Sequence, residues 1–204
     1  MKVFLYVLDT LADWEISLII AEVNSGRFFK KNIKKPPIIK VGNSKNSIKT
    51  MGGLEIIPDI DVENLNMEQG DIIILPGADT WQNGSNSKII DKIKGNDSIT
   101  IAGICGATFA LADNGLLDSK RHTSNNMDYL KMVCKNYTGE KLYEDKPAVV
   151  DGNLISASGI APLDFAFEVI KKLDVMETDT LNAWYNLYKT KEGRYFYELM
   201  NSLK

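Results

Sequence analysis

The chain has 204 residues, and 24 Lys and Arg against 27 Asp and Glu give it a formal net charge of −3. This length suits one domain, and a hydrophobic content of 44% is enough to build a core without disulfides or metals. The slight acidic excess leaves no broad basic surface for nucleic acid. No apolar run is long enough for a membrane span or a signal peptide, so we expect a cytoplasmic protein without nucleic-acid or membrane partners.

Thiol and imidazole groups, the usual zinc ligands, are scarce in this chain. Its only cysteines are Cys105 and Cys134, and its only histidine is His122. A cytosolic location predicts that both cysteines are free thiols. Two cysteines and one histidine do not reach the usual ligand count of a zinc site without several carboxylates. We therefore expect neither a metal nor an organic cofactor.

Apolar runs and helical patterns alternate along the chain. Buried strands, the last of them a hairpin with an Asp-Gly turn, are predicted at residues 3–8, 38–41, 71–75, 99–104 and 149–155. Helices are predicted at residues 13–25, 85–94, 108–113, 127–135 and 162–173, and a small separate hairpin at 47–57. Two further helical stretches follow residue 174. This alternation predicts an α/β fold with a mostly parallel sheet covered on both faces.

Cys105 lies where a predicted strand runs directly into a predicted helix. The pattern Gly103-Ile104-Cys105-Gly106-Ala107 places small residues on both sides of the cysteine, as the tight turn of a nucleophile elbow requires. The helix N-terminus behind it should lower the thiol pKa and help to hold an oxyanion. The alternative is a buried, inert cysteine, because cysteine is among the most buried residue types.

Four motifs that occur in the right order resemble the ThiJ/PfpI family of the DJ-1-like superfamily. They are Ala12–Glu15, Leu75–Ala78, Ala102–Ala107 and Gly152–Gly159. The resemblance covers residues 1–173 and implies a flavodoxin-like three-layer α/β/α sandwich, usually a homodimer. Residues 174–204 are then predicted to form a helical extension packed on the same domain.

The resemblance also implies roles for individual residues. Cys105 would be the nucleophile and Glu15 its acidic neighbour, with backbone N–H groups of Gly77, Ala78 and Gly106 forming an oxyanion site. A carboxylate in contact with a thiolate is unfavourable, so we expect Glu15 and Cys105 to share one proton, held mainly by the glutamate.

A general base is not evident. Protease-like members of the family carry a histidine directly after the cysteine, where this chain has Gly106. Other members carry a histidine or tyrosine after the next strand, where the nearest slots hold Ser124 and Asn125. His122 falls slightly early and remains a candidate base. The chain also lacks the His-x-Glu pair of related glutamine amidotransferases, which disfavours glutaminase activity.

The first functional hypothesis is a cysteine-dependent hydrolase of the protease or amidase type, with Cys105 as nucleophile. One alternative is a redox or stress-response protein that senses oxidation through Cys105. Another is glyoxalase-like handling of reactive aldehydes. The substrate, a small molecule or a peptide, stays open, and an aromatic-rich stretch at 181–197 adds to the expectation of a homodimer. The groups within hydrogen-bond reach of the Cys105 sulfur should discriminate: a base there favours an enzyme, whereas only Glu15 and apolar walls would favour redox sensing.

Overall fold

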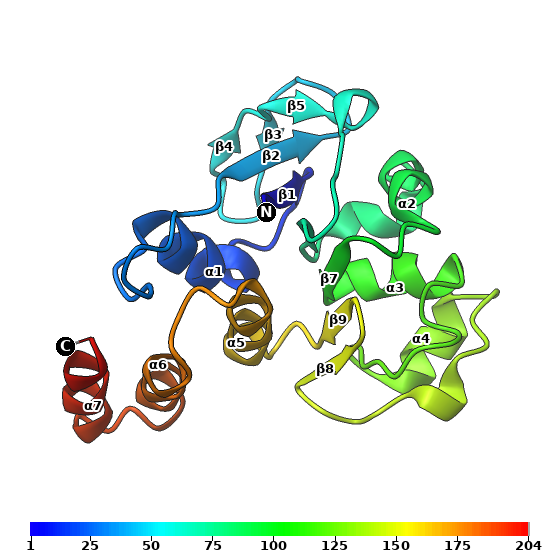
Figure 1. Ribbon diagram of the computed structural model, residues 1–204. Coiled ribbons are helices and arrows are strands. Elements are labelled where there is room, and N and C mark those ends of the chain that lie inside the picture. The colour runs from blue at the N-terminus through cyan, green and yellow to red at the C-terminus, as the bar shows by residue number, and fades with distance from the viewer. Residues whose placement is uncertain (204) are drawn as a thin grey trace.

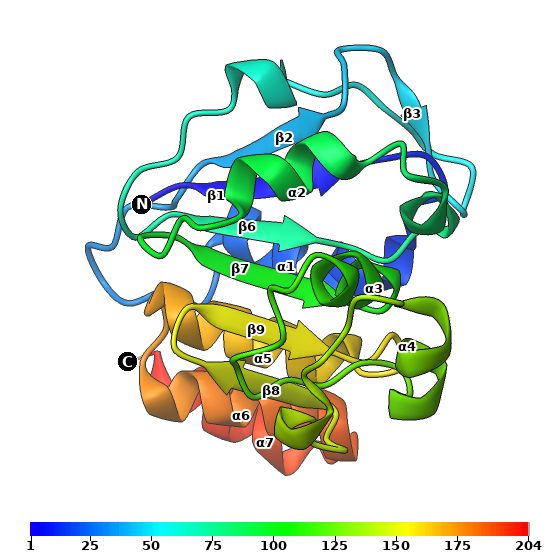
Figure 2. The same ribbon diagram turned by 90° about the vertical axis from the view of Figure 1, so that its right-hand side faces the viewer.

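A seven-stranded sheet in the order β5-β2-β1-β6-β7-β9-β8 runs through the centre of the protein (Figures 1 and 2). The computed structural model describes residues 1–203. Neighbouring strands are parallel, except that β8 and β9 are antiparallel. The strands are β1 (Val3–Val7), β2 (Ile38–Gly42), β5 (Ile60–Asp61), β6 (Ile72–Leu75), β7 (Thr100–Ile104), β8 (Ala148–Asp151) and β9 (Leu154–Ala157).

The strand sequences explain why the sheet is buried on both faces. Every residue of β1, β6, β7 and β9 is buried, as continuous apolar runs predict for strands covered by helices on both sides. A separate hairpin consists of β3 (Ile48–Lys49) and β4 (Glu55–Ile56). The sequence gives no sign of β5, because a two-residue edge strand is too short to show a pattern.

Helices cover both faces of the sheet (Figure 2). One face carries α1 (Asp13–Ser25) and α5 (Pro162–Leu173), with α6 (Thr178–Thr190) and α7 (Arg194–Ser202) outside them. The other carries α2 (Ser87–Ile93), α3 (Gly106–Asp113) and α4 (Met127–Val133). Short 3₁₀ turns are η1 (Val62–Asn64), η2 (Asp79–Asn83) and η3 (Glu140–Leu142). The predicted flavodoxin-like α/β/α sandwich is confirmed. Within residues 1–203 no helix has both the length and the apolar character to cross a membrane.

The topology places four segments of the chain next to one another. Strands β1, β6, β7 and β9 are adjacent and parallel, so their carboxyl ends meet at one edge of the sheet. In such sheets this edge is where ligands bind. The segments that follow these strands carry Glu15, Gly77, Cys105 and Gly159, residues that are far apart in the sequence.

A buried aromatic side chain packs the C-terminal helices, α6 and α7, against the sandwich. Trp184 on α6 is fully buried, and its indole N–H donates to Glu22 Oε1 on α1 at 3.1 Å. The guanidinium of Arg27 donates to the other oxygen of Glu22 at 2.8 Å. The carboxylate is therefore satisfied although it is buried, as a buried charge must be.

Removing the Trp184 side chain should destabilise the whole protein. Trp184→Ala is expected to lower the free energy of unfolding by about 3–5 kcal/mol, because it leaves a large cavity and removes the indole N–H that donates to Glu22. Tyr197→Ala on α7, where the side chain is 71% exposed, is the matched control and should change it by less than about 0.5 kcal/mol. Urea unfolding measures both. If both variants lowered the free energy of unfolding equally, residues 174–204 would be a peripheral appendage.

Candidate active site

Cys105 occupies a strained turn between β7 and α3. Its backbone has φ 56° and ψ −124°, a region that residues other than glycine rarely adopt. The turn is held on both sides, because the Cys105 N–H donates to the Ala157 carbonyl at 3.0 Å and the Cys105 carbonyl accepts from the Thr108 hydroxyl at 2.6 Å. The predicted elbow is confirmed, and its sulfur is half-buried.

Glu15 lies against the sulfur and is almost completely buried, with 1% of its surface exposed. Its Oε2 atom accepts the Gly77 N–H at 2.6 Å. Its Oε1 atom has no hydrogen-bond partner of its own among residues 1–203. A Cβ built on Gly159 would lie 2.6 Å from Cys105 Sγ and 3.1 Å from Glu15 Oε1, so these two atoms border the same small space. The structure therefore brings the predicted acid and nucleophile together.

Two glycines make this close approach possible. A Cβ on Gly77 would lie 2.7 Å from Glu15 Oε2 and 2.8 Å from Cys105 Cβ. Any side chain on Gly77 or Gly159 would therefore displace the carboxyl group or the sulfur. Both glycines belong to motifs that the sequence already singles out, which gives those motifs a steric explanation.

Asn125 donates a hydrogen bond to the sulfur. Its Nδ2 lies 3.3 Å from Cys105 Sγ, and its Oδ1 accepts the Gly159 N–H at 2.7 Å. A backbone N–H can only donate, so this second bond fixes the amide with its NH₂ group toward the sulfur. An amide NH₂ group cannot take up the thiol proton. Asn125, one of the two positions at which the resemblance led us to look for a base, therefore presents a donor to the sulfur.

The pKa of the Cys105 thiol is not lowered, contrary to the sequence prediction. Burial and the carboxyl group of Glu15 raise it to about 11, although Asn125 and the Gly106 N–H act in the opposite direction. Burial also raises the pKa of Glu15, and this outweighs the opposite effects of the Gly77 N–H and the adjacent Cys105 thiol. Two buried acids in contact cannot both ionise easily, so near neutral pH the pair keeps one proton.

His122 is not the base that the sequence left open. Its ring is fully buried, Nδ1 donates to the Lys120 carbonyl and Nε2 contacts the Tyr137 hydroxyl, both at 2.7 Å. Both nitrogens are therefore engaged, and neither is bonded to the thiol. The His122 backbone pairs with the segment at Tyr143, and the ring packs edge-on against Tyr137 and Tyr143. Burial lowers the pKa of His122, so the ring is neutral.

The N–H of Gly77, one of the three expected oxyanion amides, is already bonded to Glu15. Ala78 and Gly106 lie close together: a Cβ on Gly106 would be 3.4 Å from the Ala78 nitrogen and 3.0 Å from its carbonyl oxygen. A side chain at Gly106 would therefore require the Ala78 carbonyl to move by a few tenths of an ångström.

A sequence model of the DJ-1/PfpI family matches residues 1–172. The chain belongs to the DJ-1/PfpI family. It is 51% identical to the "Uncharacterized protease YoaZ" of Bacillus subtilis (strain 168), over 99% of this chain and 97% of that protein. It is 30% identical to the "Uncharacterized protease YdeA" of the same strain, over 96% and 94%. Among solved structures, the thiJ/pfpI family protein from Bacillus anthracis is 52% identical with a TM-score of 0.97, covering 99% of this chain and 96% of that one.

The second thiol of this DJ-1/PfpI protein lies elsewhere. Cys134 is buried at the end of α4, and its S–H donates to the Phe109 carbonyl at 3.3 Å. Burial raises its pKa to about 11, so it is a satisfied core residue, as expected. Residues 1–203 contain no cluster of three His, Cys, Asp or Glu side chains that could hold a metal ion.

The shared proton can be tested by titrating the reactivity of Cys105. On a Cys134→Ala background, the rate of iodoacetamide alkylation should rise with an apparent pKa near 11, the value that burial and Glu15 impose. Glu15→Gln removes the neighbouring negative charge and should lower this apparent pKa by about one unit or more.

Glu55→Gln, at an exposed glutamate of β4, serves as the control and should leave the profile unchanged. A wild-type apparent pKa below about 8.5, the value of a free thiol, would mean that the helix N-terminus outweighs burial.

Proposed function

We propose that this DJ-1/PfpI protein responds to peroxide through oxidation of Cys105 to a sulfinate. The observation that carries the proposal is the Asn125 amide, which donates to the sulfur and is held in that orientation by Gly159. The Glu15 carboxyl and the Gly106 N–H also act on the sulfur. When the thiol proton passes to Glu15, the sulfur faces donors, and donors stabilise an anionic sulfur and the oxygens added to it.

The oxidation balances with peroxide as the oxidant. The thiol proton passes to Glu15, and the thiolate attacks one oxygen of hydrogen peroxide. The O–O bond breaks and a sulfenic acid forms. The leaving hydroxide takes up the proton held by Glu15 and becomes water. A second peroxide molecule oxidises the sulfenate in the same way and gives a sulfinate, whose two oxygens accept hydrogen bonds. The high thiol pKa keeps the thiolate fraction small, so the reaction should be slow at low peroxide concentrations.

Peptide hydrolysis needs a group that protonates the leaving amine, and the residues at Cys105 are poorly placed to do so. After attack on a carbonyl, an amine leaving group must be protonated, and general acid–base assistance contributes about 10²- to 10⁴-fold. Asn125 cannot supply it. Glu15 is 1% exposed, so it can exchange a proton with the sulfur but cannot reach a leaving group that enters from solvent. The word protease in the names of two relatives therefore does not settle the activity of this chain.

Addition of Cys105 to an activated carbonyl is the second candidate. The neighbouring N–H groups of Ala78 and Gly106 favour it, because such amides stabilise an oxyanion. Activated esters and reactive aldehydes need little help with a leaving group, so hydrolase-like or glyoxalase-like turnover of these compounds is compatible with the site. The substrate and the homodimer stay predictions.

Peroxide treatment followed by peptide mass mapping tests the proposal. Mild hydrogen peroxide should add two oxygens to Cys105 and none to Cys134. Asn125→Ala should reduce the yield of sulfinate several-fold and let oxidation proceed to the sulfonate, because it removes a donor. Ser158→Ala is the matched control: its hydroxyl makes only a 3.5 Å contact with Asn125 Oδ1, and the Gly159 bond remains.

The same variants should be assayed with an unactivated peptide, an activated ester and methylglyoxal, with Cys105→Ala as the blank. Asn125→His supplies the missing base and should increase Cys105-dependent ester hydrolysis by about tenfold or more. Rapid, Cys105-dependent peptide cleavage by the wild-type protein, with no sulfinate after peroxide, would overturn the redox proposal in favour of the hydrolase.

A further inference from the structure

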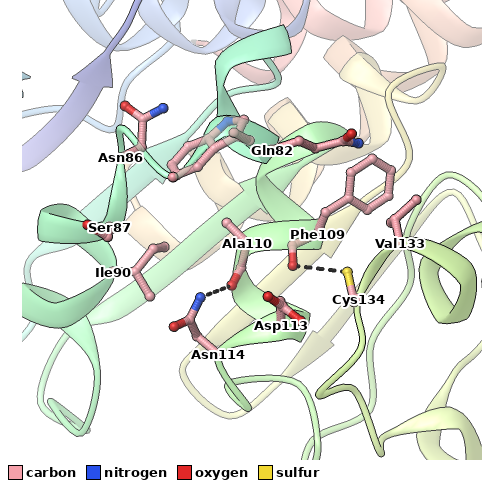
Figure 3. A pocket seen from close by; sticks show the side chains of 12 residues that line it. Gln82, Asn86, Ser87, Ile90, Phe109, Ala110, Asp113, Asn114, Val133 and Cys134 are labelled. Carbon is pink, nitrogen blue, oxygen red and sulfur yellow. Dashed lines mark hydrogen bonds between the residues drawn. The ribbon is translucent and has the colours of Figure 1, made fainter.

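A cavity of about 430 Å³ lies on the α2–α3–α4 face of the sheet (Figure 3). It is bordered by η2, α2, α3 and the end of α4. Its volume falls within the range of small-molecule sites. Cys105, Glu15 and Asn125 are absent from its lining, so it is separate from the site described above. Trp81 and the first turn of α3 stand between them: Trp81 lines the cavity, and its ring also lies 3.3 Å from a Cβ built on Gly106.

The apolar walls of the cavity are already formed. Trp81 is fixed by a 2.7 Å hydrogen bond from its indole N–H to the Pro76 carbonyl, and its ring packs against Tyr6 at 5.7 Å between centroids. Phe109 packs edge-on against Tyr129 at 5.3 Å. The apolar lining also includes Ile90, Ala110, Val133 and Cys134. A flat apolar molecule could bind here without reordering these side chains, which favours affinity.

The polar groups at the other end of the cavity are hydrogen-bond acceptors. Asp113 forms no ion pair within residues 1–203, and the hydrogen bond to its side chain comes from the Asn136 N–H, at 3.2 Å to Oδ1. Asn114 uses its NH₂ group to reach the Ala110 carbonyl at 2.9 Å, which leaves its amide oxygen available (Figure 3). An uncompensated carboxylate and an amide oxygen beside aromatic walls suit a positively charged donor group.

We propose that this cavity is a second binding site, for a small organic cation with an ammonium or amidinium group on a flat apolar body. The apolar body packs between Trp81 and Phe109, and the cation reaches Asp113 and Asn114. Cys134 forms part of the wall and takes no chemical role, since its S–H is already bonded to the Phe109 carbonyl. The charge of Asp113 disfavours an anionic ligand.

Titration of the full chain with tryptamine, followed by ¹H–¹⁵N NMR, tests the proposal. Tryptamine should bind with a dissociation constant on the order of 1 mM, as its size allows. Resonances of the Trp81 indole N–H and the Asn114 side-chain amide should shift, and that of the Asn125 side-chain amide should not. Indole-3-propionate, which has a similar body and the opposite charge, should bind at least tenfold more weakly.

Asp113→Asn keeps the shape and the Asn136 contact and should raise the dissociation constant for tryptamine about fivefold or more. Ala110→Phe fills the cavity and should abolish binding. Asp91→Asn, at an exposed position of α2 outside the cavity, is the charge-matched control and should have no effect. Equal affinity for tryptamine and indole-3-propionate, unchanged affinity in Asp113→Asn, or no saturable binding up to about 10 mM would overturn the proposal.

Discussion

The buried contact between the carboxyl group of Glu15 and the sulfur of Cys105 is the constraint on which the site depends. A carboxyl group with 1% exposure and one oxygen without its own partner is costly to ionise, and so is a half-buried thiol beside it. The local structure accommodates the pair at close range: Gly77 and Gly159 have no Cβ that would occupy the same space. The pair keeps a proton that neither group releases easily, and this proton governs the reactivity of the sulfur.

The reactions open to Cys105 depend on the other groups that face its sulfur. Four parallel strands end at one edge of the sheet, and the segment after β9 holds Asn125 with its donor side toward Cys105. A catalytic triad would place an acceptor in that position. With a donor there instead, the site is suited to stabilise an anionic sulfur or the oxygens added to it, and poorly suited to transfer protons to a substrate. This difference separates the proposed redox role from the protease-like names of the relatives.

The sequence was informative wherever the signal is local. Continuous apolar runs predicted β6 and β7, and small residues around Cys105 predicted the elbow, because both depend on a few consecutive residues. The errors concern long-range contacts. The thiol pKa was predicted in the wrong direction, because the helix N-terminus is visible in the sequence and burial is not. His122 pairs with Tyr137, and Asn125 is oriented by Gly159, 34 residues away, and no local pattern reports either contact.

The protonation of Glu15 itself tests the account most directly. The side-chain carboxyl carbon of Glu15 can be followed by ¹³C NMR in glutamate-labelled protein across a pH titration, with Glu15→Gln used to assign its signal. Because burial outweighs the opposite effects of the Gly77 N–H and the adjacent thiol, the account predicts a midpoint clearly above about 4.3, the ordinary glutamate value. A midpoint at or below that value would show that Glu15 is a stable carboxylate held by Gly77, and the shared proton would have to be abandoned.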